Sequence, residues 1–185
     1  MDFTIVEFFA EKEIISIIPN FSHSEITLFS GNYGPFEAGV VARVPLWMAL
    51  YLRQRKKCHI VPPEWMAPEA LEEIKSNELE SPLFTQLPSP HFMEISQLLL
   101  NRCPTDILHA DLVKTLIQDI MDTRAAKLRT SMDMFVRSEN THAQVNHLTQ
   151  LEICRFRRFL ILSLQQLRTL QGALKNAQAS QRSSL

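Results

Sequence analysis

The sequence predicts a mainly α-helical protein with a small β-rich (α+β) unit at its N-terminus. Only four of 185 residues are glycine, whereas a β-sandwich needs many glycine-rich turns. Short β-branched runs are confined to about the first sixty residues, and leucine-rich stretches with helical spacing fill much of the remainder. Apolar residues make up 45% of the chain, which is enough to build a core.

The first domain is predicted to span residues 1–61 and to begin with a short helix over residues 3–11. Two β-branched runs, over residues 13–18 and 25–29, predict strands because turn-forming residues bound them. The segment Gly31-Asn32-Tyr33-Gly34-Pro35 predicts a turn, since glycine and asparagine accept positive φ angles with little strain.

The rest of this domain is predicted to continue as strand, helix and strand. Residues 40–44 form the next β-branched run. Pro45 then suits the first turn of a helix through Arg55, where its missing N–H is harmless. A last strand over residues 58–61 is expected to end at Pro62-Pro63.

The larger α-helical domain is predicted to span residues 62–175, followed by a disordered tail over residues 176–185 that is rich in Gln and Ser. Six of the ten prolines lie within residues 62–90, which places the domain boundary in that stretch. Within it, we predict a helix over residues 68–75 and an extended connection over residues 76–89.

Three longer helices are expected beyond this point. Ser89 offers a capping oxygen and Pro90 fits the first helical position, so a helix is predicted from here to about Asn101. A second is predicted over residues 107–138 and a third over residues 146–174, because apolar residues recur there at helical spacing.

The third helix carries more apolar surface than its own chain is expected to cover. Its large apolar side chains span about 200° of the helix, whereas a surface helix needs a stripe a little over ~100° wide. They are Leu148, Leu151, Phe156, Phe159, Leu160, Leu162, Leu164, Leu167, Leu170 and Leu174. Any one of them alone is explained equally well by the chain's own core, but leaving four exposed would forgo roughly 6–12 kcal/mol of burial. We therefore predict contact with another subunit, through Leu160, Leu164 and Leu167.

Two basic residues of the second helix project into its apolar face. The wheel places Arg124 and Lys127 on the same face as Val113, Ile117 and Leu128. One interpretation is that both side chains extend outward along the apolar surface to reach water. The other is that Arg124 meets a carboxylate across a helix interface, in this chain or in a partner, because a buried charge must be paired. Both residues are therefore candidates for an interface.

The charge is unevenly distributed, although the total is only −1. Residues 1–52 hold six acids and two bases, whereas residues 121–185 hold four acids and ten bases. A basic cluster follows the helix predicted to end at residue 55 and consists of Arg53, Arg55, Lys56 and Lys57. It favours either helix capping with protein contact or DNA contact, and it lacks the interleaved aromatic residues of single-strand binders. The near-neutral total argues against phosphate binding as the main task.

No catalytic residue, cofactor site or metal site is predicted. His142 and His147 are five residues apart, so they do not share a helical face as a zinc pair would. The pair Gly31-x-x-Gly34 lacks the Lys-Ser/Thr of a phosphate loop. The three cysteines are scattered along the chain, which predicts a reducing compartment. The N-terminus lacks a basic signal region and the chain has no long apolar run, so we predict a soluble protein.

Blocks along nearly the whole chain resemble one family, the second-subunit family of the eukaryotic GINS assembly. The N-terminal blocks are Ile17-Ile18-Pro19-Asn20-Phe21, Gly34-Pro35-Phe36, Val44-Pro45-Leu46-Trp47, Gln54-Arg55-x-Lys57-Cys58 and Pro62-Pro63-Glu64-Trp65-Met66. The later blocks are Leu87-Pro88-Ser89-Pro90, Leu98-Leu99-Leu100-Asn101, Asp122-Thr123-Arg124-x-Ala126-Lys127-Leu128-Arg129 and Leu148-Thr149-x-x-Glu152-Ile153. The segments 22–33, 69–82 and the C-terminal tail depart from the pattern.

This resemblance implies a non-catalytic scaffold in the nucleus. Four related subunits of the family form a heterotetramer, built largely on their long helices. The tetramer joins the MCM ring and a RecJ-like partner in the CMG helicase, where the MCM ring hydrolyses ATP, so contact of this chain with DNA is expected to be indirect. Trp47 and Trp65 are expected to brace the N-terminal domain and its junction. The rival hypotheses are a DNA-binding module using the basic C-terminal third and an enzyme with an unfamiliar site.

Overall fold

The computed structural model describes residues 3–137 and 146–155, together with positions 157, 161, 162, 165 and 169. Its N-terminal part is built from the elements α1 (Phe3–Ala10), β1 (Ile14–Pro19), β2 (Ile26–Leu28), β3 (Gly31–Tyr33), β4 (Ala42–Pro45), α2 (Leu46–Gln54) and β5 (Cys58–Val61). The helical part contains η1 (Glu64–Met66), α3 (Pro68–Glu80), α4 (Phe92–Arg102), η2 (Pro104–Asp106) and α5 (Ala110–Arg137), and a further helix begins at residue 150. The predicted fold class is confirmed.

A three-stranded antiparallel sheet forms the centre of the N-terminal part, with strand order β4-β1-β5. On the central strand, Ile17 pairs with Ala42 on one side and with Ile60 on the other. Alternate residues of β1 are buried, since successive side chains point to opposite faces. The first three residues of the predicted turn, Gly31–Tyr33, form β3 instead, which pairs with β2 as a separate two-stranded ribbon, and Gly31 and Gly34 do have the positive φ angles that predicted the turn.

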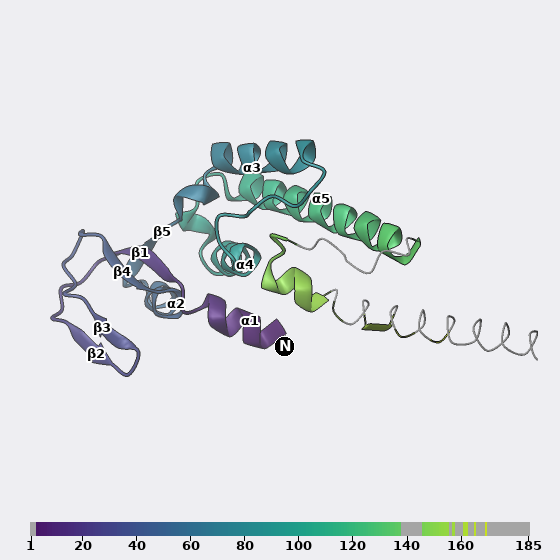
Figure 1. Cartoon of the computed structure of the whole chain (residues 1–185). Helices are drawn as coiled ribbons and strands as arrows, with labels where there is room; N and C mark the ends of the chain where they lie inside the picture. The colour runs from purple at the N-terminus through teal and green to yellow at the C-terminus, as the bar shows by residue number, and fades with distance from the viewer. Residues whose placement is uncertain are drawn as a thin grey trace, which may run out of the picture.

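The first helix of the helical part is longer than the sequence predicts. The predicted helix over residues 68–75 followed by an extended connection is wrong, because α3 continues to Glu80 and lies beside α5 (Figure 1). Contacts with α5 explain the extra turn, since Glu78 is buried and bound by Lys127 of that helix. The helix ends at Ser81, whose extended conformation is the one that the following proline favours.

Two of the remaining predicted helices, which correspond to α4 and α5, match their predicted positions apart from their first residues. Ser89 accepts a hydrogen bond from the N–H of His91 at 3.1 Å, and α4 begins after that turn. The next helix was predicted from residue 107, but Ile107 follows a 3₁₀ turn in an extended conformation and His109 has a positive φ of 53°, so α5 begins only at Ala110. The third predicted helix starts at residue 150 rather than 146, and most of its length and the predicted tail lie outside the described residues.

One apolar core joins the two parts of the chain. It runs from Ile17 of the sheet through Phe92 of α4 to Ile120 of α5, all of them buried. Trp65 packs against Phe92 with ring centroids 4.8 Å apart, so this tryptophan does brace the junction as expected. Within the described part of the chain, no helix is long and apolar enough to cross a membrane.

Candidate interaction surfaces and the charge clusters that position them

Arg124 lies at the centre of a buried charge cluster between α3, α5 and the start of the last helix. Its side chain is 0% exposed, and its Nε and Nη2 donate to the carboxylate of Glu152 at 2.8 and 3.0 Å. Nη1 donates to Glu78 Oε2 and to the carbonyl of Thr85, both at 3.0 Å, and Nη2 also donates to the carbonyl of His147 at 2.8 Å. These contacts use the full donor capacity of a guanidinium.

Lys127, one turn further along α5, binds the same carboxylate. Its Nζ donates to Glu78 Oε1 at 2.8 Å and also contacts the main-chain oxygen of Glu78. Burial alone would raise the pKa of Glu78, but hydrogen bonds from Lys127 and Thr85 and the charge of Arg124 bring this pKa below its usual range. The carboxylate partners of Arg124 and Lys127 in the structure thus belong to this chain, one of the two possibilities that the sequence left open.

The charge cluster also fixes where the last helix starts. Thr149 and Glu152 form a capping box, in which Glu152 accepts from the N–H of Thr149 at 2.7 Å and Thr149 Oγ1 accepts from the N–H of Glu152 at 3.3 Å. Since Glu152 also binds Arg124, the cap ties this helix to α5. The first turn of this helix is therefore fixed relative to α5.

Apolar side chains of the last helix are exposed at several described positions. They are Ile153, Ile161 and Leu162. The predicted packing residues Leu160, Leu164 and Leu167 lie outside the described residues, so their role stays a prediction.

A second charge cluster, which we call the clasp, joins the N-terminal part to the helical part. Arg53 of α2 donates to both oxygens of Asp106 in η2, with Nε–Oδ2 at 2.6 Å and Nη2–Oδ1 at 2.9 Å. The N–H of Ile60 in β5 donates to Asp106 Oδ2 at 3.0 Å, and His59 Nδ1 lies 3.3 Å from Oδ1. Burial alone would raise the pKa of Asp106, but the hydrogen bonds from Ile60 and Arg53 lower it.

The predicted basic cluster is divided by this arrangement. Arg53 is bound in the clasp, whereas Arg55 stacks on the ring of Tyr51, with its guanidinium carbon 4.5 Å from the ring centroid. Lys56 and Lys57 are exposed in the turn between α2 and β5. Three of the four cations of this cluster, Arg55, Lys56 and Lys57, are therefore exposed.

Helix α1 presents an apolar surface to solvent. Val6 and Ala10 face the core, but Phe8 on the other side is 55% exposed, and Phe9 is exposed beside it. The exposed apolar residues here, which we call the α1 surface, are Ile5, Phe8, Phe9, Ile14 and Trp47. Trp47 was expected to brace the domain, yet it lines a surface hollow with Phe8 and Lys12. Contiguous exposed apolar groups of this kind mark interaction sites.

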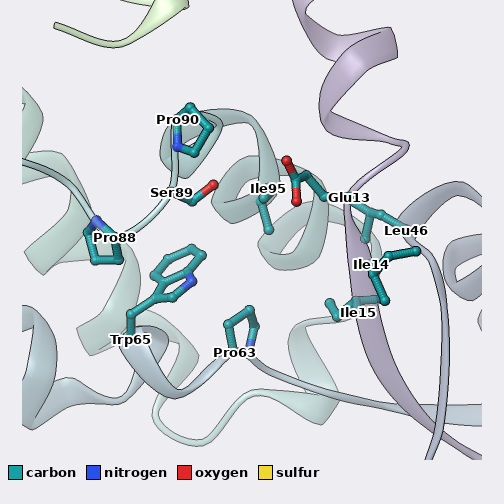
Figure 2. A pocket seen from close by; sticks show the side chains of 10 residues that line it. All are labelled: Glu13, Ile14, Ile15, Leu46, Pro63, Trp65, Pro88, Ser89, Pro90 and Ile95. Atoms are coloured by element: carbon teal, nitrogen blue, oxygen red, sulfur yellow. The ribbon is translucent and has the colours of Figure 1, made fainter. Parts of the chain in front are cut away.

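A smaller hollow of about 270 Å³, the junction hollow, lies where the two parts of the chain meet (Figure 2). Its lining comes from the start of β1, the start of α2, η1, the segment before α4, and α4 itself. The residues are Glu13, Ile14, Ile15, Leu46, Pro63, Trp65, Pro88, Ser89, Pro90 and Ile95. The wall is mainly apolar, with a few polar groups facing inward.

The other side chains with a shifted pKa do not form a catalytic site among the described residues. Burial raises the pKa of the Cys58 thiol to about 11, so this cysteine stays protonated and weakly nucleophilic near neutral pH. Burial likewise raises the pKa of Glu94, whose carboxylate oxygens have no hydrogen-bond partner among the described residues. Within the same part of the chain, no three His, Cys, Asp or Glu side chains gather in a way that suits a metal ion.

The carboxylates that hold both clusters were missed by the sequence reasoning. Glu78 was expected in an extended connection, and Asp106 falls between two predicted helices, where no role was predicted for it. A usable signal existed for Glu152, because Thr149-x-x-Glu152 is the pattern of a capping box. Nothing local identifies the partners of Glu78 or Asp106, since each lies more than forty residues away along the chain.

Comparison with known proteins gives similarity over nearly the whole chain. A sequence profile of the PSF2 N-terminal domain matches residues 2–61, and one of the GINS complex protein helical bundle domain matches residues 65–171. The DNA replication complex GINS protein PSF2 of Homo sapiens is 45% identical over 181 residues, covering 98% of each chain. A probable GINS protein PSF2 of Drosophila melanogaster is 47% identical over 182 residues, covering 98% of this chain and 88% of the relative. The PSF2 protein of Candida albicans is 35% identical over 167 residues, covering 89% and 80%.

Proposed function

Because the chain belongs to the PSF2 family of GINS subunits, we propose that it acts as a non-catalytic scaffold subunit in the GINS complex of DNA replication. The observation that carries the proposal is similarity through both the N-terminal and the helical segments of the chain. The proposal divides the protein into a β-rich domain over residues 1–61 and a helical domain over residues 62–175. Each contributes a surface for partners.

The partners in this proposal are the three sister subunits of a heterotetramer. The last helix supplies one contact surface through its exposed apolar side chains and through Leu160, Leu164 and Leu167. Ile153, Ile161 and Leu162 are exposed in the isolated chain, which supports contact with another protein at this helix. An obligate interface of this kind buries more than roughly 2,000 Å² in total.

Arg124 and Lys127 serve assembly indirectly in this proposal. Both are bound inside the chain, where they hold α3, α5 and the first turn of the last helix in place. They thereby set the direction in which that helix meets a sister subunit. The assembled tetramer then joins the MCM ring and its RecJ-like partner in the nucleus, with DNA contact by this chain being indirect.

Co-expression with the three sister subunits tests the scaffold role. We expect Leu162→Asp to lower the recovery of tetramer on a sizing column severalfold, because a charged group would enter an apolar contact. Gln165→Asp is the matched control on the same helix, since this position is exposed and already polar. A tetramer that forms equally well with Leu162→Asp and with the control would contradict an interface at this point.

The chain expressed without its sister subunits gives a second test. Expressed alone, it should be poorly soluble, and the tetramer should be well behaved. A chain that stays monomeric and indifferent to its sister subunits at micromolar concentration would overturn the scaffold proposal.

A further inference from the structure

The junction hollow has the properties of a small binding site. Eight of its ten lining residues are apolar, and polar atoms also form part of the exposed wall, as in pockets that bind a side chain or a small ligand. Ile15, Leu46 and Ile95 are buried and form part of its wall, whereas Ile14 is exposed at its edge. A guest would therefore bury apolar atoms here.

The backbone that carries the lining residues Trp65 and Glu13 is held in place before any guest arrives, whereas the Glu13 side chain is exposed. Trp65 packs on Phe92, and the turn that carries it is closed by a hydrogen bond from the N–H of Met66 to the carbonyl of Pro63. Glu13 is fixed at both backbone groups, because its N–H donates to Ala10 and its carbonyl accepts from Leu46. A site built in advance loses less conformational entropy on binding.

The hydrogen-bonding groups of the hollow favour a guest that donates. Three of the lining residues, Pro63, Pro88 and Pro90, have no N–H to offer a guest, and the carbonyl of Pro63 already accepts a hydrogen bond from Met66. Glu13 is the one charged residue in the lining, and no cationic side chain pairs with it among the described residues. Figure 2 shows its carboxylate and the indole nitrogen of Trp65 turned toward the same space. The polar side chains of the lining are thus the carboxylate acceptor of Glu13, the indole donor of Trp65, and the hydroxyl of Ser89, whose oxygen already accepts from the N–H of His91.

We propose that the junction hollow binds one arginine side chain carried by a short segment of a partner protein. The apolar stem of the arginine lies against Pro63, Pro90 and Ile95, and its guanidinium binds the carboxylate of Glu13. The indole N–H of Trp65 donates to a main-chain carbonyl of the same segment. Glutamine or lysine in place of arginine would lose the charge or the planar two-point contact, respectively.

The partner lies outside the four-subunit assembly. Among the described residues, none beyond Ile95 lines the hollow, so the hollow shares no residue with the described part of the last helix, on which the contact with sister subunits is proposed. This inference rests on the proposed function, because the partner is a protein that meets the assembled complex. The net negative charge of residues 1–52, with six acids and two bases, also favours a basic segment.

The test uses the co-expressed tetramer with 5-fluorotryptophan incorporated, followed by fluorine NMR. The Trp65 signal is identified by its absence from a Trp65→Phe complex. Two blocked tripeptides are titrated, N-acetyl-Ala-Arg-Ala-amide and its citrulline counterpart, which has the same shape without the charge. We expect the arginine peptide to shift the Trp65 signal saturably at a concentration about fivefold lower, because a partly exposed ion pair contributes up to about 1 kcal/mol.

Two variants separate this site from general electrostatic attraction. Glu13→Gln should bring the two peptides to equal affinity, whereas Glu11→Gln should leave the fivefold preference unchanged, since Glu11 lines the neighbouring hollow at Lys12 and Trp47. The inference would be overturned if both peptides bound the native complex equally, or if neither shifted the Trp65 signal. It would also be overturned if the preference for the arginine peptide survived Glu13→Gln. A tetramer that does not form contradicts the proposed function, whereas one that forms without this preference contradicts the inference alone.

Discussion

Two arginines hold distant segments together in this protein, and they do so in different surroundings. Arg124 binds Glu152 through two nitrogens inside the helical part, and Arg53 binds Asp106 through two nitrogens at the junction of the two parts. The Arg124 side chain is 0% exposed, whereas that of Arg53 is 19% exposed beside an aspartate that is 5% exposed. The geometry of the pairs is alike, and the access to water differs.

Burial decides how many partners each arginine requires. Arg124 has two carboxylates and two main-chain carbonyls around it, because a guanidinium removed from water must have its donors satisfied. Burial alone would lower its pKa, but Glu152 and Glu78 raise it, so the arginine stays charged. Arg53 needs only Asp106 and Thr105, since water reaches the rest of its side chain. We expect loss of the buried pair to have the larger effect.

The largest effect is expected from Arg124→Met, a change that keeps much of the side-chain volume. It leaves Glu78 and Glu152 buried without their shared cation, and breaking such a pair costs about 3–5 kcal/mol. Hydrogen exchange in the co-expressed tetramer should show amides near Thr149 and Glu152 opening far more readily. The same complex should be recovered in lower yield on a sizing column.

A matched control separates two effects of Arg124→Met, the loss of the ion pairs and the burial of two carboxylates without a cation. Replacing Glu78 and Glu152 with glutamine in the Arg124→Met background should restore part of the protection, because the uncompensated charges are removed with their partner. Unchanged exchange near Thr149 in the single variant would mean that the cluster does not hold the last helix. An intact tetramer yield would mean that Arg124 has no part in assembly.

A smaller effect, about 1–2 kcal/mol, is expected from Asp106→Asn at the clasp. Asparagine keeps the shape but loses the charge that binds Arg53 and the strong acceptor for the N–H of Ile60. Amides of β5 should exchange faster in the variant at neutral pH. Amides of the distant helix α5 should change little, which would separate the clasp from the Arg124 cluster.

The clasp should also depend on pH in a defined direction. The pKa of Asp106 is lowered in the folded protein, so its stabilising effect is present above the pKa of an unfolded aspartate, about 3.9, and is lost as pH falls from there toward the lower folded value. The difference between native chain and Asp106→Asn should therefore shrink in this acid range. A difference that stays constant from neutral to strongly acidic pH would show that the charge of Asp106 is not its source.

Much of the fold was predictable because its signals are local. Proline at the start of α2, the β-branched runs of β1 and β5, and the helical spacing of α5 all act within a few residues. The end of α3 was not predictable in this way. Its last turn is stabilised by Lys127, which lies far along the chain, so local propensity gave an extended segment where tertiary contact gives a helix.

In the candidate sites, too, local patterns were predictable from the sequence and tertiary contacts were not. Periodicity placed Arg124 on an apolar face and left two interpretations, extension to water or a carboxylate partner, and it could not name Glu78 or Glu152. The basic cluster was visible as four neighbouring cations, yet only the structure shows that Arg53 is bound by Asp106 and the others are not. The junction hollow depends on the meeting of segments from Glu13 to Ile95, which no local pattern reports.

The smallest effect is expected at the ion pair between Lys75 of α3 and Asp119 of α5. Its atoms are only 2.6 Å apart, as close as those of the clasp, but the side chains are 33% and 41% exposed. Water already solvates both charges, so Lys75→Ala should change the exchange of nearby α3 amides by less than about 1 kcal/mol, and added salt should reduce even that difference. Lys114→Ala is the control, because this lysine is exposed on α5 and outside the ion pairs of the described residues. If Lys75→Ala proved as damaging as Asp106→Asn, distance rather than access to water would govern these pairs, and the comparison of the two arginines would lose its physical basis.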